Sequence, residues 1–172
     1  MHLALATAAP DVITFMQDVR LFTEFTPQEL TAIASRLGTR RLRKGQILRE
    51  RSHAGDMFVV RRGRIVISKV VTPGVEHVLE RFGPGDFFGE ASLFAAAPSS
   101  VSVQAEVDTE LLVLERGSLD NLFDASPRAA RSFFETIAQE CVERLERTQD
   151  LIAEVTRWGL EATGMEPFAA RI

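Results

Sequence analysis

Residues 82–103 read FGPGDFFGEASLFAAAPSSVSV, and this stretch decides how the chain is interpreted. Residues 83–85 (Gly-Pro-Gly) predict a tight turn, because glycine takes a positive φ cheaply and proline pre-sets the φ of a turn's second residue. Residues 89–94 then predict one or two helical turns that open on glycine. A helix start offers unpaired backbone N–H groups and a partial positive charge, which suit an anion.

Glu90 lies at the opening of this short helix, where its carboxylate can accept hydrogen bonds from hydroxyl groups. A second turn, Pro98-Ser99-Ser100, is rich in small donors and leads into the alternating strand 101–107. Ser92, Ser99 and Ser100 are interpreted either as phosphate ligands or as plain turn residues, and both interpretations stay open. The physical prediction is a small pocket for a phosphate and a sugar.

The same stretch resembles the phosphate-binding cassette of the cyclic-nucleotide-binding domain. That family includes bacterial regulators of the catabolite activator and FNR type and the regulatory subunit of cyclic-AMP-dependent kinase. Its cassette runs roughly Phe-Gly-Glu, a variable residue, a small residue, Leu, a few residues, then Pro-Arg and small residues. The matching positions are Phe88, Gly89, Glu90, Ser92, Leu93 and Pro98. The resemblance implies a ligand site made of Phe88, Gly89, Glu90, Ala91, Ser92, Leu93, Ser99 and Ser100.

One position departs from the family pattern. The resemblance implies that Glu90 binds the ribose 2′-hydroxyl. The family's arginine, which pairs with the cyclic phosphate, is replaced by Ser99 in this sequence. Losing one partner of a buried charge pair costs about 2–5 kcal/mol, which at about 1.4 kcal/mol per tenfold weakens binding tens to thousands of times. The cations considered as substitutes are Arg81, Arg144 and Arg147. The expected ligand is cAMP or cGMP, with binding weakened by Ser99.

The composition is that of an ordinary globular protein. The 172 residues fit one domain with an extension, and 45% are apolar and 26% charged. A net charge of −4 argues against nucleic-acid binding by bulk electrostatics. The single cysteine excludes an internal disulfide framework. No apolar run predicts membrane insertion, and residues 1–10 lack the Lys or Arg of a signal peptide, so the expected compartment is the cytoplasm.

The residues before the strands predict two helices. The first spans residues 11–22, after a loose tail. The second begins at Thr26, because Thr26 and Glu29 form a capping box and Pro27 occupies the first helical position. Its apolar spacing continues to Gly38, which is predicted to stop it.

Short strands with turns between them are predicted from Thr39 to Leu114. The predicted strands are 57–60, 65–67, 75–82, 101–107 and 111–114, with Leu42 and Ile47-Leu48 flanking a turn at Lys44-Gly45. Many short strands at regular spacing favour an antiparallel barrel or sandwich. Residues 55–60, with Gly63, and 108–114 also resemble the family's barrel. The fold expected is mainly β, an antiparallel β-roll of jelly-roll type with N-terminal helices and a long C-terminal helix.

Two helices are predicted after the strands. Ser118 is expected to cap a short one, and Ser126-Pro127 begins a long one that nothing interrupts before Gly159, about 45–50 Å in length. Its early part, near Phe133 and Phe134, is expected to pack on the barrel. A heptad seam runs along it, formed by Phe134, Ala138, Cys141, Leu145, Thr148, Ile152 and Val155.

This seam predicts a homodimer, because no chain remains to cover it. Ile137, Leu151 and Trp158 widen the seam on one side. In the dimeric regulators of the family the matching helix is the dimer interface. The predicted organisation is a tail with a short helix (1–19), a β-roll with flanking helices (20–125), a dimerisation helix (126–159) and a tail (160–172).

Several other features favour plain structural interpretations. Residues 36–64 hold ten Lys or Arg against two acids, and we interpret these charges as solvated strand faces rather than a patch for anionic partners. His2, His53 and His77 show no metal-ligand spacing, and Cys141 is expected to be a buried small apolar residue. No catalytic constellation appears, so neither an enzyme nor a metal site is predicted.

The sequence supports two alternative functions. The first is a non-enzymatic sensor module that binds a small phosphorylated ligand, a cyclic nucleotide above all, and signals through the long helix to an unknown effector protein. The second is a degenerate fold that binds no nucleotide and serves as a dimeric interaction scaffold. A DNA-binding repressor is disfavoured, and no sequence-specific DNA binding is expected, because only 13 residues follow Gly159.

Overall fold

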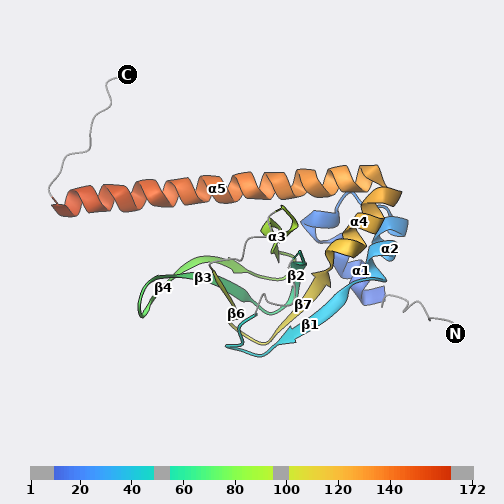
Figure 1. Cartoon of the computed structure of the whole chain (residues 1–172), viewed down its shortest axis with the longest axis horizontal. Helices are drawn as coiled ribbons and strands as arrows, with labels where there is room; N and C mark the ends of the chain where they lie inside the picture. Colours follow the sequence, from blue (N-terminus) through green and yellow to red (C-terminus); the bar gives the residue numbers. More distant parts are fainter. Residues whose placement is uncertain (1–9, 49–54, 95–100, 164–172) are drawn as a thin grey trace, which may run out of the picture. The chain divides into compact units, whose positions relative to one another are not determined.

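The computed structural model in Figure 1 describes residues 10–48, 55–94 and 101–163. Three helical segments come first: α1 (Pro10–Gln17), the 3-10 helix η1 (Arg20–Phe22) and α2 (Pro27–Ala34). The strands are β1 (Gly38–Leu42), β2 (Met57–Arg62), β3 (Ile65–Thr72), β4 (Val75–Phe82), β5 (Phe87–Phe88), β6 (Ser102–Ala105) and β7 (Thr109–Leu114). The remaining helices are α3 (Ala91–Phe94), α4 (Arg116–Ala125) and α5 (Pro127–Thr163).

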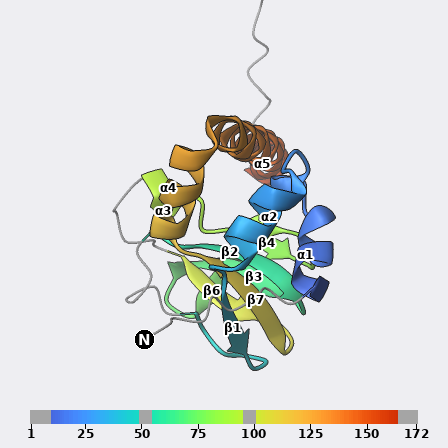
Figure 2. The ribbon, with the colours of Figure 1, turned by 90° about the vertical axis from the view of Figure 1, so that its right-hand side faces the viewer.

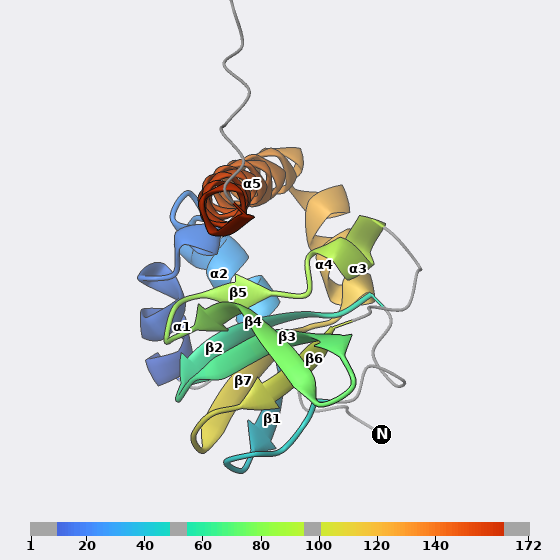
Figure 3. The same cartoon turned by 90° about the vertical axis from the view of Figure 1, so that its left-hand side faces the viewer.

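The strands form two antiparallel sheets, which confirms the predicted β-roll. One sheet has the order β1-β7-β2-β5 and the other the order β4-β3-β6 (Figure 3). A core of buried side chains is shared by both sheets: Leu42, Leu48, Phe58, Val60, Ile65, Phe82, Phe88, Val103, Ala105, Leu111 and Val113. Helices α1, α2 and α4 gather at one end of the strands of the larger sheet (Figures 1 and 2).

The predicted first helix is divided in two, so the continuous helix over 11–22 was wrong. Helix α1 ends at Gln17 and η1 follows from Arg20 to Phe22. Met16 and Leu21 are both fully buried. In one continuous helix at about 100° per residue they would stand about 140° apart. The break lets both side chains reach the core.

The capping box of α2 is confirmed. The Glu29 backbone N–H donates to Thr26 Oγ1 at 3.3 Å, and the Thr26 N–H donates to Glu29 Oε2 at 2.7 Å. The predicted end was wrong, because α2 stops at Ala34 and Gly38 is already the first residue of β1. Gly38 pairs with Val113 of β7, and this pairing requires the chain to leave the helix earlier.

The predicted strands are present, with differences at their ends. Strand β3 runs on to Thr72, and β6 covers only Ser102–Ala105. The turn at Lys44-Gly45 is also present, because Gly45 has a φ of 80° and Ile47 forms a bridge with Gln104 of β6.

The starts of the last two helices differ in how they are capped. Helix α4 begins at Arg116 after Glu115, so the prediction that Ser118 caps it was wrong. The predicted start of α5 is confirmed, since the Ala129 N–H donates to Ser126 Oγ at 3.3 Å. Helix α5 continues past Gly159 to Thr163, because one exposed glycine costs a helix only about 1 kcal/mol. Its 37 residues measure about 55 Å.

The chain divides into two compact units, Met1–Phe133 and Phe134–Ile172. In the second unit the predicted seam residues Phe134, Ala138, Cys141, Leu145, Thr148, Ile152 and Val155 are all exposed. The expectation that Cys141 is buried was therefore wrong for the single chain, in which this side chain is exposed. No helix in the described part of the chain has the length and apolar character that crossing a membrane requires.

Candidate ligand-binding site

The cassette residues begin at the edge of the larger sheet, where Phe88 anchors them. Phe88 pairs with Phe58 of β2 and is only 3% exposed. Its ring stacks on Phe58 with centroids 5.2 Å apart and meets Phe82 at 5.4 Å. Phe88 is thus part of the core, and its contribution to a site is to fix where Gly89 and Glu90 begin.

Gly89 is required by its backbone and by its surroundings. Its φ is 88°, a conformation that L side chains rarely adopt. A Cβ at this position would lie 3.0 Å from the Asp56 carbonyl oxygen and 3.3 Å from Cδ2 of Phe58. The glycine therefore lets the chain turn tightly against the start of β2, directly before Glu90.

The Ser92 hydroxyl is engaged with the backbone of this turn. Ser92 Oγ lies 2.6 Å from the Gly89 carbonyl oxygen and 3.0 Å from that of Asp56. A hydroxyl has one proton to donate, so its donor capacity is used to hold the turn closed. The structure thus gives Ser92 a positioning contact, and its predicted contact with a ligand stays a prediction.

Helix α3 is a single turn that begins at Ala91, two residues after the glycine that was expected to open it. The Ser92 and Leu93 N–H groups donate to the carbonyls of Gly89 and Glu90, each at 3.0 Å. The Ala91 N–H takes part in neither bond. One turn carries little of a long helix's dipole, so individual N–H groups matter more at this position than a helix-end charge.

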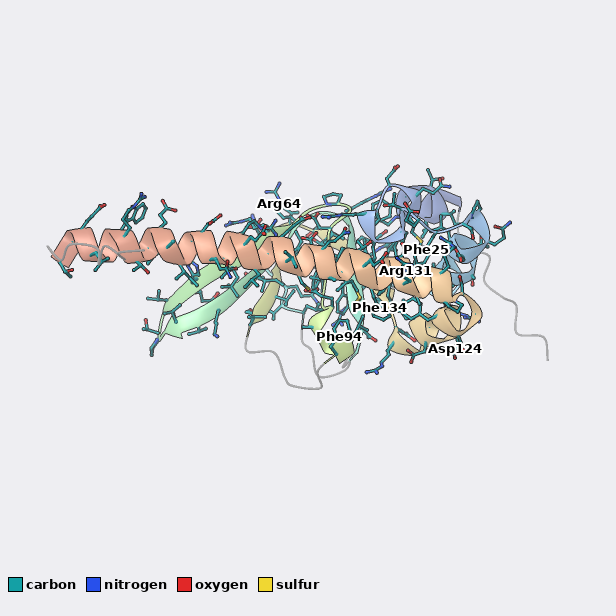
Figure 4. The ribbon with its side chains drawn as sticks, turned by 90° about the horizontal axis from the view of Figure 1, so that it is seen from above. Phe25, Arg64, Phe94, Asp124, Arg131 and Phe134 are labelled. Atoms are coloured by element: carbon teal, nitrogen blue, oxygen red, sulfur yellow. The ribbon has the colours of Figure 1, made fainter. Side chains whose placement is uncertain are left out.

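Glu90 is the acidic residue of the predicted site. Its side chain is half-buried, and its Oε2 atom is shielded from solvent. Leu93 is also half-buried, whereas the Phe94 side chain is 65% exposed on α3 (Figure 4). The predicted residues 88–93 are consecutive, so the structure brings them together. Pro98, Ser99 and Ser100 lie outside the described residues.

The three cations considered as substitutes for the missing arginine are all paired with carboxylates. Arg81 Nε donates to Glu106 Oε1 at 2.8 Å. On α5, Arg144 Nε lies 3.3 Å and Arg147 Nη2 3.7 Å from Oε1 of Glu140. In each of the three, a carboxylate already engages one of the guanidinium nitrogens and would compete with a phosphate for its donors.

Part of the basic stretch 36–64 is neutralised by acids. Arg41 Nε and Arg61 Nη1 contact the two oxygens of Glu110 at 3.0 and 2.6 Å, and Arg61 also pairs with Asp11 of α1. Burial raises the pKa of Glu110, but the Arg41 hydrogen bond and the Arg61 charge outweigh it and hold this pKa below its ordinary value. These pairs support the interpretation of the stretch as strand faces.

Arg40 is a residue that the sequence reasoning missed. It pairs with Leu111 of β7, and Leu42, two residues further along β1, is only 2% exposed. Residues two apart on a strand share a face, so Arg40 lies on the core face. Its Nη1 atom is buried without a hydrogen-bond partner among the described residues. The period-two pattern through Leu42 was the signal that could have identified it.

The chain is similar to known proteins in sequence and in structure. The sequence profile of the cyclic nucleotide-binding domain matches residues 39–126. A cyclic nucleotide-gated potassium channel of Rhizobium etli is 32% identical over 127 residues, which are 73% of this chain and 33% of the channel. A CRP-like cAMP-activated global transcriptional regulator of Mycobacterium tuberculosis is 23% identical over 136 residues, 78% of this chain and 59% of the regulator. The chain therefore spans only part of these relatives.

Solved structures share the fold. The catabolite activator protein of Thermus thermophilus matches with a TM-score of 0.64 and 28% identity, over 78% of this chain and 63% of that one. A cyclic nucleotide-binding domain from Methylobacillus flagellatus matches with a TM-score of 0.69 and 20% identity, over 84% and 82% of the two chains. With the profile match covering half of its length, the chain belongs to the cyclic nucleotide-binding domain family.

Proposed function

We propose that this chain is a non-enzymatic regulatory module that binds a cyclic nucleotide in its β-roll and signals through α5 to an effector protein. The observation that carries the proposal is the geometry after β5. Phe88 is fixed in the core, Gly89 has the positive φ of a tight turn, and half-buried Glu90 follows at once. This is the Phe-Gly-Glu start of the family's cassette.

Each group in the turn has a role in the proposal. The Glu90 carboxylate accepts a hydrogen bond from the ribose 2′-hydroxyl, and the Ala91 N–H at the start of α3 donates to the cyclic phosphate. Ser92 holds the turn in shape through the carbonyls of Gly89 and Asp56. Ser99 and Ser100 complete the phosphate contacts with hydroxyl and N–H groups in place of the family's arginine.

The relatives support a cyclic nucleotide as the ligand class. By their names, one relative is a potassium channel gated by cyclic nucleotides and another is a cAMP-activated regulator. A regulatory domain of a Toxoplasma gondii kinase, similar in fold, was solved with cAMP. We extend this ligand class to the present chain, with cAMP and cGMP as the first candidates.

Calorimetric titration with cAMP, cGMP and cyclic dinucleotides tests the ligand. The wild type is compared with Glu90→Ala and with Glu115→Ala, a matched control at an exposed N-cap that makes no side-chain capping bond. We expect binding to weaken about ten- to a hundredfold in Glu90→Ala, the range for a hydrogen bond to a charged group. The control should bind like the wild type. Equal binding by all three proteins would remove Glu90 from the site.

The proposal includes a homodimer through α5. Leu145, Ile152 and Val155 are 57%, 60% and 57% exposed, although they recur at the heptad spacing that buries side chains between two helices. A second copy of the chain is the occupant that shares this spacing. In the proposed dimer, a structural change that ligand binding causes in one β-roll is passed on to the paired α5 helices.

The alternative function is a dimeric scaffold that binds no nucleotide, and Ser99 favours it. Without a cation at that position the pocket lacks the family's phosphate partner. Calorimetric titration distinguishes the two functions. A folded dimer that gives no signal with any cyclic nucleotide at millimolar concentration would support the scaffold.

A further inference from the structure

The hairpin formed by β3 and β4 carries apolar side chains that the β-roll leaves exposed. Strand β6 pairs with β3 only as far as Ser68, so beyond that residue the hairpin is a ribbon of two strands among the described residues (Figure 1). Five aliphatic side chains of this ribbon are exposed: Val70, Val71, Val75, Val78 and Leu79. A two-stranded ribbon is only marginally stable by itself, and an exposed apolar patch marks an interaction site.

One face of this ribbon also carries two basic side chains. Lys69 is paired with His77 across the hairpin. Val75 lies two residues before His77 on β4, and residues two apart on a strand share a face, so Val75 stands on the face of this pair. Val71 and Leu79 are the extra residues at two β-bulges and add apolar surface to the ribbon. Neither Lys69 nor His77 has an ion pair in the described part of the chain.

Helix α5 has an apolar stripe that a two-stranded seam does not use. Leu151 and Trp158 are both exposed and lie seven residues apart, each one residue before a core position of the seam. In a two-stranded coiled coil that flanking position is often Glu or Lys. Glu154 and Glu161 follow Leu151 and Trp158 by three positions each, so they lie next to them on the helix surface. Neither glutamate has an ion pair among the residues that the structure describes.

We propose that the β3–β4 hairpin of one copy packs on the stripe of Leu151 and Trp158 of the second copy in the dimer. The proposal rests on the α5 dimer of the proposed function and names a contact by which one β-roll reaches the helix of its partner. Both surfaces are exposed in the single chain, and their charges are complementary, since the basic pair of the hairpin faces the two glutamates of the stripe. A second copy supplies both surfaces without any further component.

Trp158 is the single tryptophan of the chain, so its fluorescence reports on the stripe directly. Emission spectra are compared for the wild type, Val75→Asp and Val70→Asp at a concentration where sedimentation shows a dimer. Val70→Asp is the matched control, because Val70 is similarly exposed but is paired with Glu76, on the opposite face of the ribbon.

We expect Val75→Asp to shift the Trp158 emission to longer wavelength, because the acidic flank of the stripe repels the aspartate and water enters the contact. The control Val70→Asp should emit like the wild type, and both variants should remain dimeric because the seam on α5 is unchanged. Identical emission from the wild type and Val75→Asp, with both proteins folded and dimeric, would overturn the proposal.

The variant Leu145→Glu separates a contact with the second copy from one within a single chain. It is expected to be monomeric, and its Trp158 should emit at longer wavelength than that of the wild type. Adding Val75→Asp to Leu145→Glu should then leave the emission unchanged, because the stripe of the partner is gone. A further shift would place the hairpin on α5 of its own chain and contradict the proposal.

Failure of this contact is distinguishable from failure of the proposed function. A dimeric wild type whose Trp158 emits like that of monomeric Leu145→Glu overturns the hairpin contact alone. A monomeric wild type overturns both the α5 dimer and the hairpin contact. Binding of cAMP or cGMP is measured separately by calorimetry and depends on neither result.

Discussion

The hydroxyl of Ser126 donates a hydrogen bond to the carboxylate of Glu29, a residue 97 positions earlier in the chain. Ser126 caps α5, while Glu29 closes the capping box of α2. Arg128 pairs with the same carboxylate and also donates to the Glu24 carbonyl oxygen at 2.7 Å. One side chain therefore joins the first turn of α5 to the N-terminal helices.

Replacing Glu29 by glutamine should destabilise the fold by about 1–3 kcal/mol, the range for a lost cap and a lost hydrogen bond to a charged group. Burial raises the pKa of Glu29, but the hydrogen bonds from Ser126 and Thr26 and the charge of Arg128 outweigh it, so this pKa lies below its ordinary value of 4.5. The carboxylate thus stabilises the folded state above pH 4.5, and this contribution is lost as the pH falls through the lowered pKa.

Urea unfolding of the wild type and Glu29→Gln between pH 7 and pH 3 measures this effect. The difference in unfolding free energy should be full near neutrality and should shrink below pH 4.5. Glu24→Gln, at an exposed position nearby, serves as the control and should change little. A difference that grows as the pH falls would show that the sign of the linkage is wrong.

Two glycines with similar backbones should respond differently to alanine. Gly63 and Gly74 have φ values of 91° and 82°, but a Cβ at Gly63 would lie 2.5 Å from the Asp108 carbonyl oxygen, whereas nothing lies within 4 Å at Gly74. Gly74→Ala should cost about 1–2 kcal/mol for the left-handed conformation alone. Gly63→Ala adds overpacking and should cost about 2–5 kcal/mol. Chemical denaturation checks the pair, and equal losses would contradict the close approach of the Asp108 backbone to Gly63.

The dimer is tested by Leu145→Glu. Leu145 is 57% exposed in the single chain, and a glutamate there would place like charges across the two-fold axis of paired helices. We expect the wild type to sediment as a dimer at tens of micromolar and the variant as a monomer with an unchanged circular dichroism spectrum. Glu154→Gln, an exposed position outside the seam, should remain dimeric. A monomeric wild type would refute the interface.

The native cysteine gives an independent check on the same interface. Cys141 is exposed and lies on the predicted seam, so a parallel dimer brings two copies of it face to face. Mild oxidation with diamide should convert the wild type to a covalent dimer on a non-reducing gel, and Cys141→Ser should stay monomeric there. If the purified wild type is dimeric but does not cross-link, the helices pair along another face.

Local patterns predicted the parts of the fold that local chemistry determines. The capping box and the proline starts located α2 and α5, and glycine turns with short apolar runs located the strands. The wrong helix bounds arose where contacts between residues distant in sequence decide the structure. The pairing of Gly38 with Val113 sets the end of α2, and the burial of Leu21 divides the first helix.

For the candidate site, too, the sequence motif anticipated some features of the structure and missed others. The motif includes Gly89, whose φ and close neighbours explain why glycine stands in this turn, while its place in a ligand site stays a prediction. The motif did not foresee that Ser92 would be held by backbone carbonyls from two segments, nor that Arg40 would lie on the core face. Both depend on how β1 and β2 pair with distant strands.

The central claim is that the turn after β5 forms a cyclic-nucleotide site weakened by its missing arginine. Its most direct test is calorimetric titration of cAMP into the wild type and Ser99→Arg side by side. An arginine there adds a bidentate pair with the phosphate, so we predict a gain of roughly 1.5–3 kcal/mol, about ten- to 150-fold in affinity. No heat of binding in either folded protein at millimolar cAMP would contradict the claim and leave the scaffold function in its place.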